Sequence, residues 1–198
     1  MNRIMRYLTH PQVSIDPHTP VGHWSLSHEG LMRTNKVATA TGLSKTTQII
    51  SSAETKARQT AMIIAKSLKL EILVRERMHE NDRSSTGFLP PAEFEAMADD
   101  FFAHPGQSVD GWERAIDAQR RIVGETNQII AQHDGGDLLL VGHGAVGTLL
   151  YCHFADRPIS RTFDQPAGGG NYFAVALETG RVLHHWQPME TLLQEQIL

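Results

Sequence analysis

Residues 137–154 read DLLLVGHGAVGTLLYCHF. Residues 137–142, which are apolar after Asp137, predict a buried strand. Its lack of polar alternation is typical of a central strand in a parallel sheet. The residues that follow, 143–154, predict a helix. A buried strand that leads directly into a helix is the unit from which α/β folds are built.

The rest of the chain repeats this alternation of strand and helix. Strands are predicted over residues 4–8, 47–51 and 71–74, and the segments 171–178 and 181–187 predict an antiparallel hairpin that turns at Thr179-Gly180. Helices are predicted from Ser27 to Gly42, from a capping box of Ser51 and Glu54, over 91–104, and from Ser108 to Ile130. We therefore expect an α/β three-layer sandwich with a mostly parallel central sheet flanked by helices and a C-terminal antiparallel hairpin.

Composition sets limits on function and location. The 198 residues carry a formal net charge of −4, which gives no reason to expect nucleic acid or an anionic membrane as a partner. Cys152 is the only cysteine, so no internal disulfide can form, which suits a reducing, cytoplasmic setting. The N-terminus lacks the apolar core of a signal peptide, and no apolar run approaches the roughly 20 residues needed to span a bilayer.

Polar side chains follow three of the predicted strands. His10 follows the first strand, Ser51 and Ser52 end the second, and His143 follows the strand at 137–142. Ligands of open α/β sheets bind beyond the carboxyl ends of the strands, so we expect these groups at one edge. The Gly144 backbone N–H would lie near a helix N-terminus, where anions bind. Taken alone, His143 fits a loop histidine bonded to backbone equally well.

Two more charged residues are candidates for this edge. Arg58 falls early in the helix that follows Ser51, and a guanidinium there could reach back to phosphate oxygens. Glu80 lies in the polar segment 75–91, which has little apolar periodicity and is long for a compact domain. Taken alone, each residue is better explained as an ordinary solvated surface group.

In combination these segments resemble the histidine phosphatase superfamily, whose fold is called phosphoglycerate-mutase-like. SSAETKARQTAMIIA (51–65) resembles its second-arginine segment, LLLVGHGAVG (138–147) its second-histidine segment, RERMHEND (75–82) the segment of its acidic proton donor, and LSHEG (26–30) the start of its first helix. The order of the pieces agrees as well. The resemblance implies one domain over residues 1–198, with His10, Arg58, Glu80 and His143 as catalytic residues.

The opening stretch departs from the family signature, which is arginine-histidine-glycine after the first strand. Here the three positions hold Thr9, His10 and Pro11. Proline removes a backbone N–H and fixes φ. An asparagine that many members have six residues after the histidine falls at Asp16, whose carboxylate would repel a phosphate.

The resemblance implies a phosphatase that hydrolyses a phosphate monoester through a phosphohistidine on His10. Arg58, His143 and the Gly144 N–H would hold the phosphoryl oxygens, and Glu80 would protonate the leaving oxygen. A lost charge-assisted contact costs about 1.5–3 kcal/mol. We expect Thr9 to bind substrate with only a neutral hydroxyl, and Arg83 to bind substrate as well and restore the missing charge.

Several alternatives stay open at this stage. Arg6 or Arg33 could take the place of Arg83. The altered signature also fits an impaired relative that binds a phosphorylated ligand or protein. A metal-dependent hydrolase could use His10 and His143 with further ligands from His18 or Asp16, although no short ligand pair is present. For the phosphatase we expect no metal or cofactor and a small phosphorylated molecule as partner; the oligomeric state is open, with a homodimer as the candidate.

Overall fold

The computed structural model describes residues 3–194 and has a six-stranded sheet at its centre. The strands are β1 (Ile4–Thr9), β2 (Thr46–Ser52), β3 (Ile72–Arg75), β4 (Asp137–Gly142), β5 (Asn171–Ala176) and β6 (Val182–Pro188). Their order across the sheet is β3-β2-β4-β1-β5-β6. The pairs β3–β2, β2–β4 and β4–β1 are parallel, whereas β5 is antiparallel to both of its neighbours. The expected sheet and C-terminal hairpin are confirmed.

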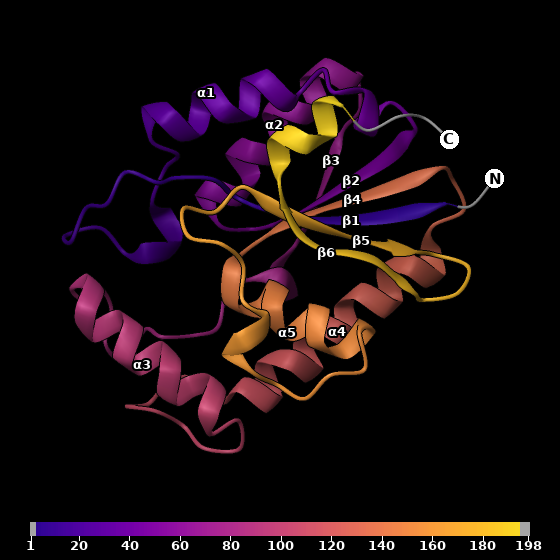
Figure 1. The fold of residues 1–198 in the computed structure, drawn as a ribbon. Coiled ribbons are helices and arrows are strands. Elements are labelled where there is room, and N and C mark those ends of the chain that lie inside the picture. Colours follow the sequence, from indigo (N-terminus) through magenta and orange to yellow (C-terminus); the bar gives the residue numbers. More distant parts are fainter. Residues whose placement is uncertain (1–2, 195–198) are drawn as a thin grey trace.

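Helices cover both faces of this sheet (Figure 1). The α-helices are α1 (His28–Val37), α2 (Thr55–Leu68), α3 (Pro91–Ala103), α4 (Ala115–Gln132) and α5 (Gly144–Phe154). Short 3-10 turns occur at Val21–His23, Thr41–Leu43, Glu76–Met78, Arg161–Phe163 and Met189–Leu193. Helices α1 and α2 lie on one side of the sheet and α3, α4 and α5 on the other. Within residues 3–194, no helix is both long and apolar enough to cross a membrane.

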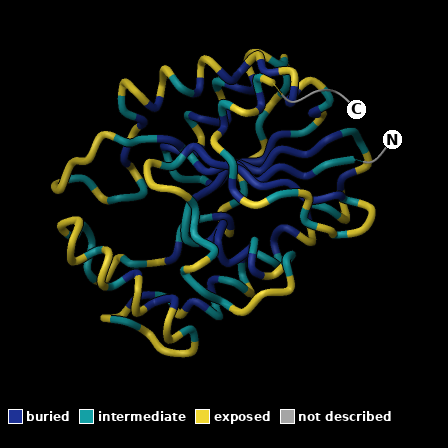
Figure 2. Tube along the Cα trace, in the orientation of Figure 1, coloured by how far each residue is buried: buried dark blue, intermediate teal, exposed yellow. Residues whose placement is uncertain are grey.

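The alternation of side chains along the strands divides the apolar core into two parts. Leu139 and Val141 of β4 pack with residues of α2, whereas Leu138 and Leu140 pack with residues of α4 and α5. All six residues of β4 are buried, which is why its sequence carries no polar alternation. Figure 2 shows the buried residues concentrated along the strands, with exposed ones on the outer helices and loops.

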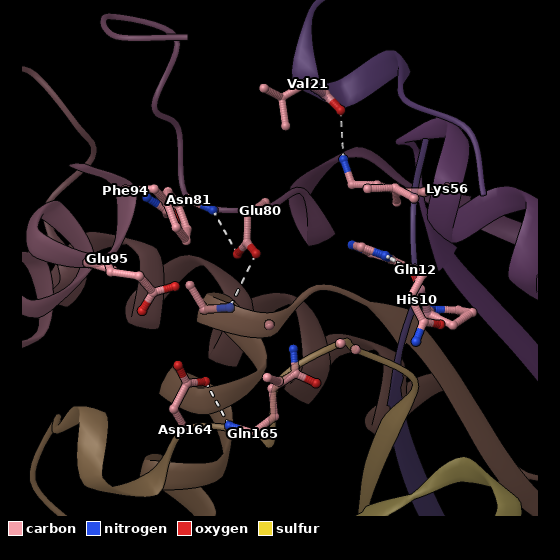
Figure 3. A pocket seen from close by; sticks show the side chains of 18 of the residues that line it. His10, Gln12, Val21, Lys56, Glu80, Asn81, Phe94, Glu95, Asp164 and Gln165 are labelled. Atoms are coloured by element: carbon pink, nitrogen blue, oxygen red, sulfur yellow. Dashed lines mark hydrogen bonds between the residues drawn. The ribbon is translucent and has the colours of Figure 1, made fainter. Parts of the chain in front are cut away.

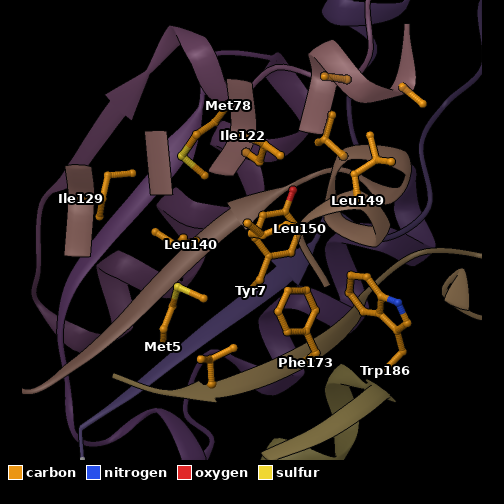
Figure 4. Close-up of a cluster of buried hydrophobic side chains, with 14 of the residues drawn as sticks. Met5, Tyr7, Met78, Ile122, Ile129, Leu140, Leu149, Leu150, Phe173 and Trp186 are labelled. Atoms are coloured by element: carbon orange, nitrogen blue, oxygen red, sulfur yellow. The ribbon is translucent and has the colours of Figure 1, made fainter. Parts of the chain in front are cut away.

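An aromatic stack on β1, β5 and β6 fills the core on the α4–α5 side (Figure 4). The rings of Tyr7 and Phe173 stack at a centroid distance of 5.5 Å, and Trp186 meets Phe173 edge-on at 4.9 Å. The Tyr7 hydroxyl accepts a hydrogen bond from the His143 backbone N–H at 3.0 Å and lies 3.2 Å from the His143 carbonyl oxygen. The core therefore fixes the backbone at the point where β4 gives way to α5.

Some predicted helix boundaries are wrong. Ser27 does cap α1, since its hydroxyl accepts from the Gly30 N–H at 3.1 Å, but the helix ends at Val37 and Gly42 belongs to a separate 3-10 turn. Ser51 and Glu54 form no capping box, because Ser51 continues β2 and α2 begins at Thr55.

The start predicted for the long helix is also wrong. Ser108 lies before α4, which begins at Ala115, and its hydroxyl donates to the Trp112 carbonyl at 2.6 Å within the preceding loop. A serine hydroxyl satisfies a backbone group in a turn as readily as at a helix start.

Candidate active site

The carboxyl ends of β1, β2 and β4 bring two histidines and a serine together. The rings of His10 and His143 lie 5.3 Å apart, centroid to centroid, with their planes at 68°. His143 Nε2 lies 2.8 Å from the Ser52 hydroxyl oxygen. The structure brings the side chains of His10, Ser52 and His143 together at one edge of the sheet. This agrees with the expectation from the rule for parallel sheets.

His10 is held as a neutral ring with one nitrogen available. Its Nδ1 lies 2.8 Å from the Pro11 carbonyl oxygen, which can only accept, so Nδ1 carries the proton in this contact. The unshared pair is therefore on Nε2. Burial, and after it the positive charge of Lys56, lowers the pKa of His10 to about 4. Near neutral pH the ring has the protonation state that a nucleophile needs.

His143 is fully buried at the N-terminus of α5. Burial lowers the pKa of His143 well below its ordinary value, although the nearby carboxylate of Glu54, 3.4 Å from Nε2, opposes this shift. Its Nδ1 has no hydrogen-bond partner among the described residues. Gly142 before it must lack a side chain, because a Cβ there would lie 2.2 Å from the Tyr7 hydroxyl oxygen.

The Glu80 carboxylate lies across the N-terminus of α5. It accepts hydrogen bonds from the backbone N–H groups of Ala145 at 3.2 Å and Val146 at 3.0 Å. Burial raises the pKa of Glu80, and the negative charge of Glu54 adds to this rise, while the bond from Val146 opposes it. A carboxyl group with a raised pKa keeps a protonated fraction at higher pH, as a general acid requires.

The cation that α2 contributes to the site is Lys56, not the predicted Arg58. Lys56 is 4% exposed, donates to the Val21 carbonyl oxygen at 2.8 Å and forms an ion pair with Glu54. Arg58 is exposed. A helix turns about 100° per residue, so positions 56 and 58 point in nearly opposite directions.

The sequence contains a signal for the right residue. The predicted helix start at Ser51 is four residues early, since α2 starts at Thr55, but this shift does not change the helix face on which a residue lies. Lys56, Thr60 and Ile64 are all buried and recur at a spacing of four, which is the pattern of one helix face.

Thr9 does not line the site, although the sequence placed it among the substrate-binding residues. Its side chain is fully buried and its hydroxyl contacts Gln165 Oε1 at 2.7 Å. Gln165 itself lines the cavity. It belongs to the irregular segment between α5 and β5, where nothing in the sequence pattern marks it.

Arg83 does line the cavity, as does Gly144. The Arg83 guanidinium is half-buried and lies 4.7 Å from the centroid of the Phe94 ring. The two alternative arginines are engaged elsewhere: Arg6 forms a buried ion pair with Asp137 at 2.8 Å, and Arg33 pairs with Glu190 at 2.7 Å. Neither of them lines the cavity.

Asp16 does not line the cavity, so the expected repulsion between its carboxylate and a bound phosphate does not arise. Asp16 is exposed and its carboxylate accepts from the Thr19 hydroxyl and the His18 N–H. His18 is exposed in the same loop. Across residues 3–194 no three histidine, cysteine, aspartate or glutamate side chains are grouped so that they could hold a metal ion. The predicted alternative of a metal centre on His10 and His143 with these residues is therefore not assembled.

The site opens into a cavity of about 550 Å³. Figure 3 shows Glu80 and Gln165 on facing walls, with His10 and Lys56 to one side. Apolar groups and charges of both signs share the lining: Pro11, Val13, Ile15, Val21, Trp24, Phe94, Ala98 and Phe102 with Lys56, Arg83, Arg161, Glu80, Glu95 and Asp164. Its walls can therefore surround an organic group that carries polar substituents.

A comparison with protein-family models identifies the family of this chain. The model for the histidine phosphatase superfamily (branch 1) matches residues 18–185, so the chain belongs to that superfamily. The matched part includes Lys56, Glu80 and His143 and begins after His10. A comparison with curated protein sequences finds no match.

Solved structures of the same fold cover nearly the whole chain. A mycobacterial glucosyl-3-phosphoglycerate phosphatase bound to inorganic phosphate is 19% identical, with a TM-score of 0.73 and coverage of 93% of this chain and 94% of that one. YhfR of Bacillus stearothermophilus is 21% identical, with a TM-score of 0.75 and coverage of 92% and 94%. The alpha-ribazole phosphatase of Shigella flexneri is 13% identical, with a TM-score of 0.70 and coverage of 94% and 96%.

Proposed function

We propose that this protein is a phosphatase that hydrolyses a phosphate monoester of a small molecule through a phosphohistidine on His10. The observation that carries the proposal is the state of His10, which lines the cavity: Nδ1 donates to the Pro11 carbonyl oxygen, and the low pKa leaves Nε2 unprotonated. Membership of the superfamily and the names of two similar structures, both phosphatases, support it.

In the first step His10 Nε2 attacks phosphorus and the bond to the leaving oxygen breaks. The Glu80 carboxyl group gives its proton to that oxygen, which leaves as an alcohol. In the second step the Glu80 carboxylate takes a proton from water. The water oxygen attacks phosphorus, the P–N bond breaks, and His10 returns to its neutral form as phosphate departs.

Positive charge for the phosphoryl oxygens comes from Lys56 and Arg83 in this proposal, with His143 as a neutral donor. Lys56 is compensated by its ion pair with Glu54, so its attraction for a phosphate is reduced. Among the described residues Arg83 forms no ion pair within 4.0 Å, and the carboxylates of Glu80 and Glu54 act on its charge only from a greater distance. The proposal therefore retains Arg83 as the residue that restores the charge of the missing arginine.

A second function is favoured by one observation, namely the Glu54 carboxylate beside His143. A carboxylate 3.4 Å from His143 Nε2 opposes the binding of a doubly charged phosphate. A relative that binds a phosphorylated ligand weakly and transfers nothing would tolerate this charge. Formation of a covalent phosphohistidine separates this reading from the first.

The test uses p-nitrophenyl phosphate, whose leaving group is acidic and needs little help from Glu80. We expect Glu80→Gln to form the phosphohistidine but to hydrolyse it slowly, so that acid-labile, base-stable phosphate accumulates on the protein. His10→Ala should form none. The phosphatase proposal fails if the wild-type protein neither turns over this substrate nor becomes phosphorylated, and bound but unreacted phosphate ester would then support the second function.

We further propose a cytoplasmic protein whose partner is a small phosphorylated metabolite. Cys152 is free and buried, which fits a reducing compartment. Fractionation of the producing cells tests the location directly.

A further inference from the structure

Gln165 has a side-chain amide whose oxygen is fully engaged by protein. Its Oε1 lies 2.7 Å from the Thr9 hydroxyl and accepts from Asn171 Nδ2 at 3.2 Å. A carbonyl oxygen has two lone pairs, and these two contacts use both. What remains of the amide is its NH2 group, and the residue lines the cavity beside His10.

The orientation of this amide follows from a chain of contacts that ends on backbone. Asn171 also contacts the Pro166 carbonyl oxygen, at 2.9 Å, and a carbonyl can only accept. The Asn171 atom at that contact is therefore its nitrogen. The same nitrogen faces Gln165, so the facing atom of Gln165 must be its oxygen. A reversed amide would set two donors against each other.

The NH2 group is consequently turned toward the start of α5. A Cβ on Gly144 would lie 2.5 Å from Gln165 Nε2, so only glycine leaves room for the amide there. Figure 3 shows this nitrogen directed into the cavity, on the wall that faces Glu80. Gly144 and His10 line the same cavity.

We infer that Gln165 is a phosphate-binding residue, whose NH2 group donates to a non-bridging oxygen of the phosphoryl group at His10. Thr9 is then a positioning residue: it lies directly before His10 and holds the amide oxygen of Gln165 away from the substrate. Where the family signature has arginine, a charged hydrogen-bond donor, this chain has Thr9. Thr9 instead positions the neutral NH2 donor of Gln165. This inference deepens the proposed function and rests on it.

Gln165→Glu is the sharpest variant, because it keeps an oxygen for Thr9 and Asn171 and replaces the donor by an anionic oxygen. We expect kcat/KM for p-nitrophenyl phosphate to fall roughly a hundredfold in Gln165→Glu and roughly tenfold in Gln165→Ala, the range of a hydrogen bond to a charged group. Gln107→Ala, at an exposed loop glutamine, is the matched control and should leave kinetics unchanged.

Thr9→Val tests the positioning role, since it keeps the shape of the side chain and removes the hydroxyl. We expect a several-fold loss of kcat/KM in the wild-type background and no further loss in the Gln165→Ala background. Independent, merely structural damage would lower kcat/KM by the same factor in both backgrounds. Thermal unfolding of each variant identifies loss of fold.

Inorganic phosphate keeps this test separate from the test of the reaction. If the wild-type protein has no turnover, the proposed function fails, and the affinity for inorganic phosphate, measured by calorimetry, then tests Gln165 alone. Weaker phosphate binding by folded Gln165→Glu supports the inference. Turnover and phosphate affinity both within twofold of wild type in Gln165→Glu would overturn it.

Discussion

The side chain of Glu54 accepts a hydrogen bond from the backbone N–H of Glu80, with 2.9 Å between Glu54 Oε1 and Glu80 N. This hydrogen bond links the two residues, whose carboxyl groups have pKa values shifted in opposite directions. Burial alone would raise the pKa of Glu54, but the neighbouring His143 and Lys56 and the bonds from Lys56 and Glu80 hold it well below its usual range. Burial and the Glu54 charge raise the pKa of Glu80. A pair divided in this way supports the proposed role of Glu80 as the acid.

The pH dependence of kcat/KM follows from these shifts. His10 must be neutral to attack, so activity should fall as the pH drops through about 4, the pKa of His10. Glu80 must be protonated in the first step, so activity should also fall as the pH rises through the raised pKa of Glu80. We expect a bell-shaped profile with an acidic optimum, measured with an alkyl phosphate. A profile that rises steadily up to pH 8 would contradict both assignments.

Glu54→Gln should strengthen phosphate binding while it weakens the fold. The amide oxygen can still accept from the Glu80 N–H, but the negative charge beside His143 and Lys56 disappears. We expect severalfold tighter binding of inorganic phosphate by calorimetry, and a loss of about 3 kcal/mol of unfolding free energy because buried Lys56 loses its partner.

The same variant has a second signature in the pH profile. Without the Glu54 charge the pKa of Glu80 is lowered, so the alkaline limb should move to lower pH. Glu71→Gln, at an exposed position, is the control. Unchanged phosphate affinity together with an unmoved alkaline limb would show that Glu54 does not act on the site.

The sequence predicted the sheet and its edge well because both depend on short-range patterns. The apolar residues 138–142 that follow Asp137 predict the central strand β4, and the rule for strand ends brings His10 and His143 together. The start of α2 lies at Thr55 and not at the predicted Ser51, because capping patterns alone do not fix a helix start closely. Whether Lys56 or Arg58 faces the site depends instead on which face of α2 packs against the sheet, and the buried spacing 56, 60, 64 selects Lys56.

Contacts between segments that are distant in the sequence could not be predicted, for a different reason. Thr9 and Gln165 are 156 positions apart and meet only because β5 pairs with β1 and returns the preceding loop to the site. The spacing predicts Glu54 in a capping box, whereas its place beside Lys56 and Glu80 depends on the tertiary arrangement of α2 against the 75–91 segment. No local periodicity encodes either contact.

Lys56→Met and Arg58→Ala form a pair that decides which cation serves the cavity. Lys56 lines it and Arg58 is exposed. We expect Lys56→Met to lower kcat/KM by roughly tenfold or more, the cost of one hydrogen bond to a charged group, and Arg58→Ala to stay within about twofold. Loss of activity in Arg58→Ala with a folded protein would restore the assignment made from the sequence.

Arg83→Ala should weaken both catalysis and phosphate affinity by roughly tenfold to a hundredfold, because the site loses a positive charge that no close ion pair among the described residues engages. Arg83→Lys keeps the charge but loses the planar contact with Phe94, so we expect it to recover part of the activity. Arg181→Ala, at an exposed arginine, serves as control. Unchanged kinetics and phosphate affinity in Arg83→Ala would exclude this residue as the substitute for the missing arginine.

Arg121 of α4 fixes the loop that carries Glu80. Its Nη1 donates to the carbonyl oxygens of Arg77 at 2.8 Å and His79 at 2.9 Å, and Nη2 to that of Glu80 at 3.3 Å. Both Nε and Nη2 also bond to Glu113, at 2.9 and 2.7 Å. Lysine cannot reproduce this fork of donors. In Arg121→Lys the loop is therefore held less firmly and the Glu80 carboxyl group is less well placed over the cavity.

Because Arg121 acts through Glu80, the effect of Arg121→Lys should depend on the leaving group. An alkyl phosphate needs the proton from Glu80 when its P–O bond breaks, whereas p-nitrophenyl phosphate needs it little. We expect kcat/KM to fall roughly tenfold for the alkyl ester and much less for the p-nitrophenyl ester, with Arg120→Ala, at a largely exposed neighbour, as control. Equal losses on both substrates would mean that Arg121 supports the fold in general and does not position the acid, since a general loss of folded protein lowers both rates by the same factor.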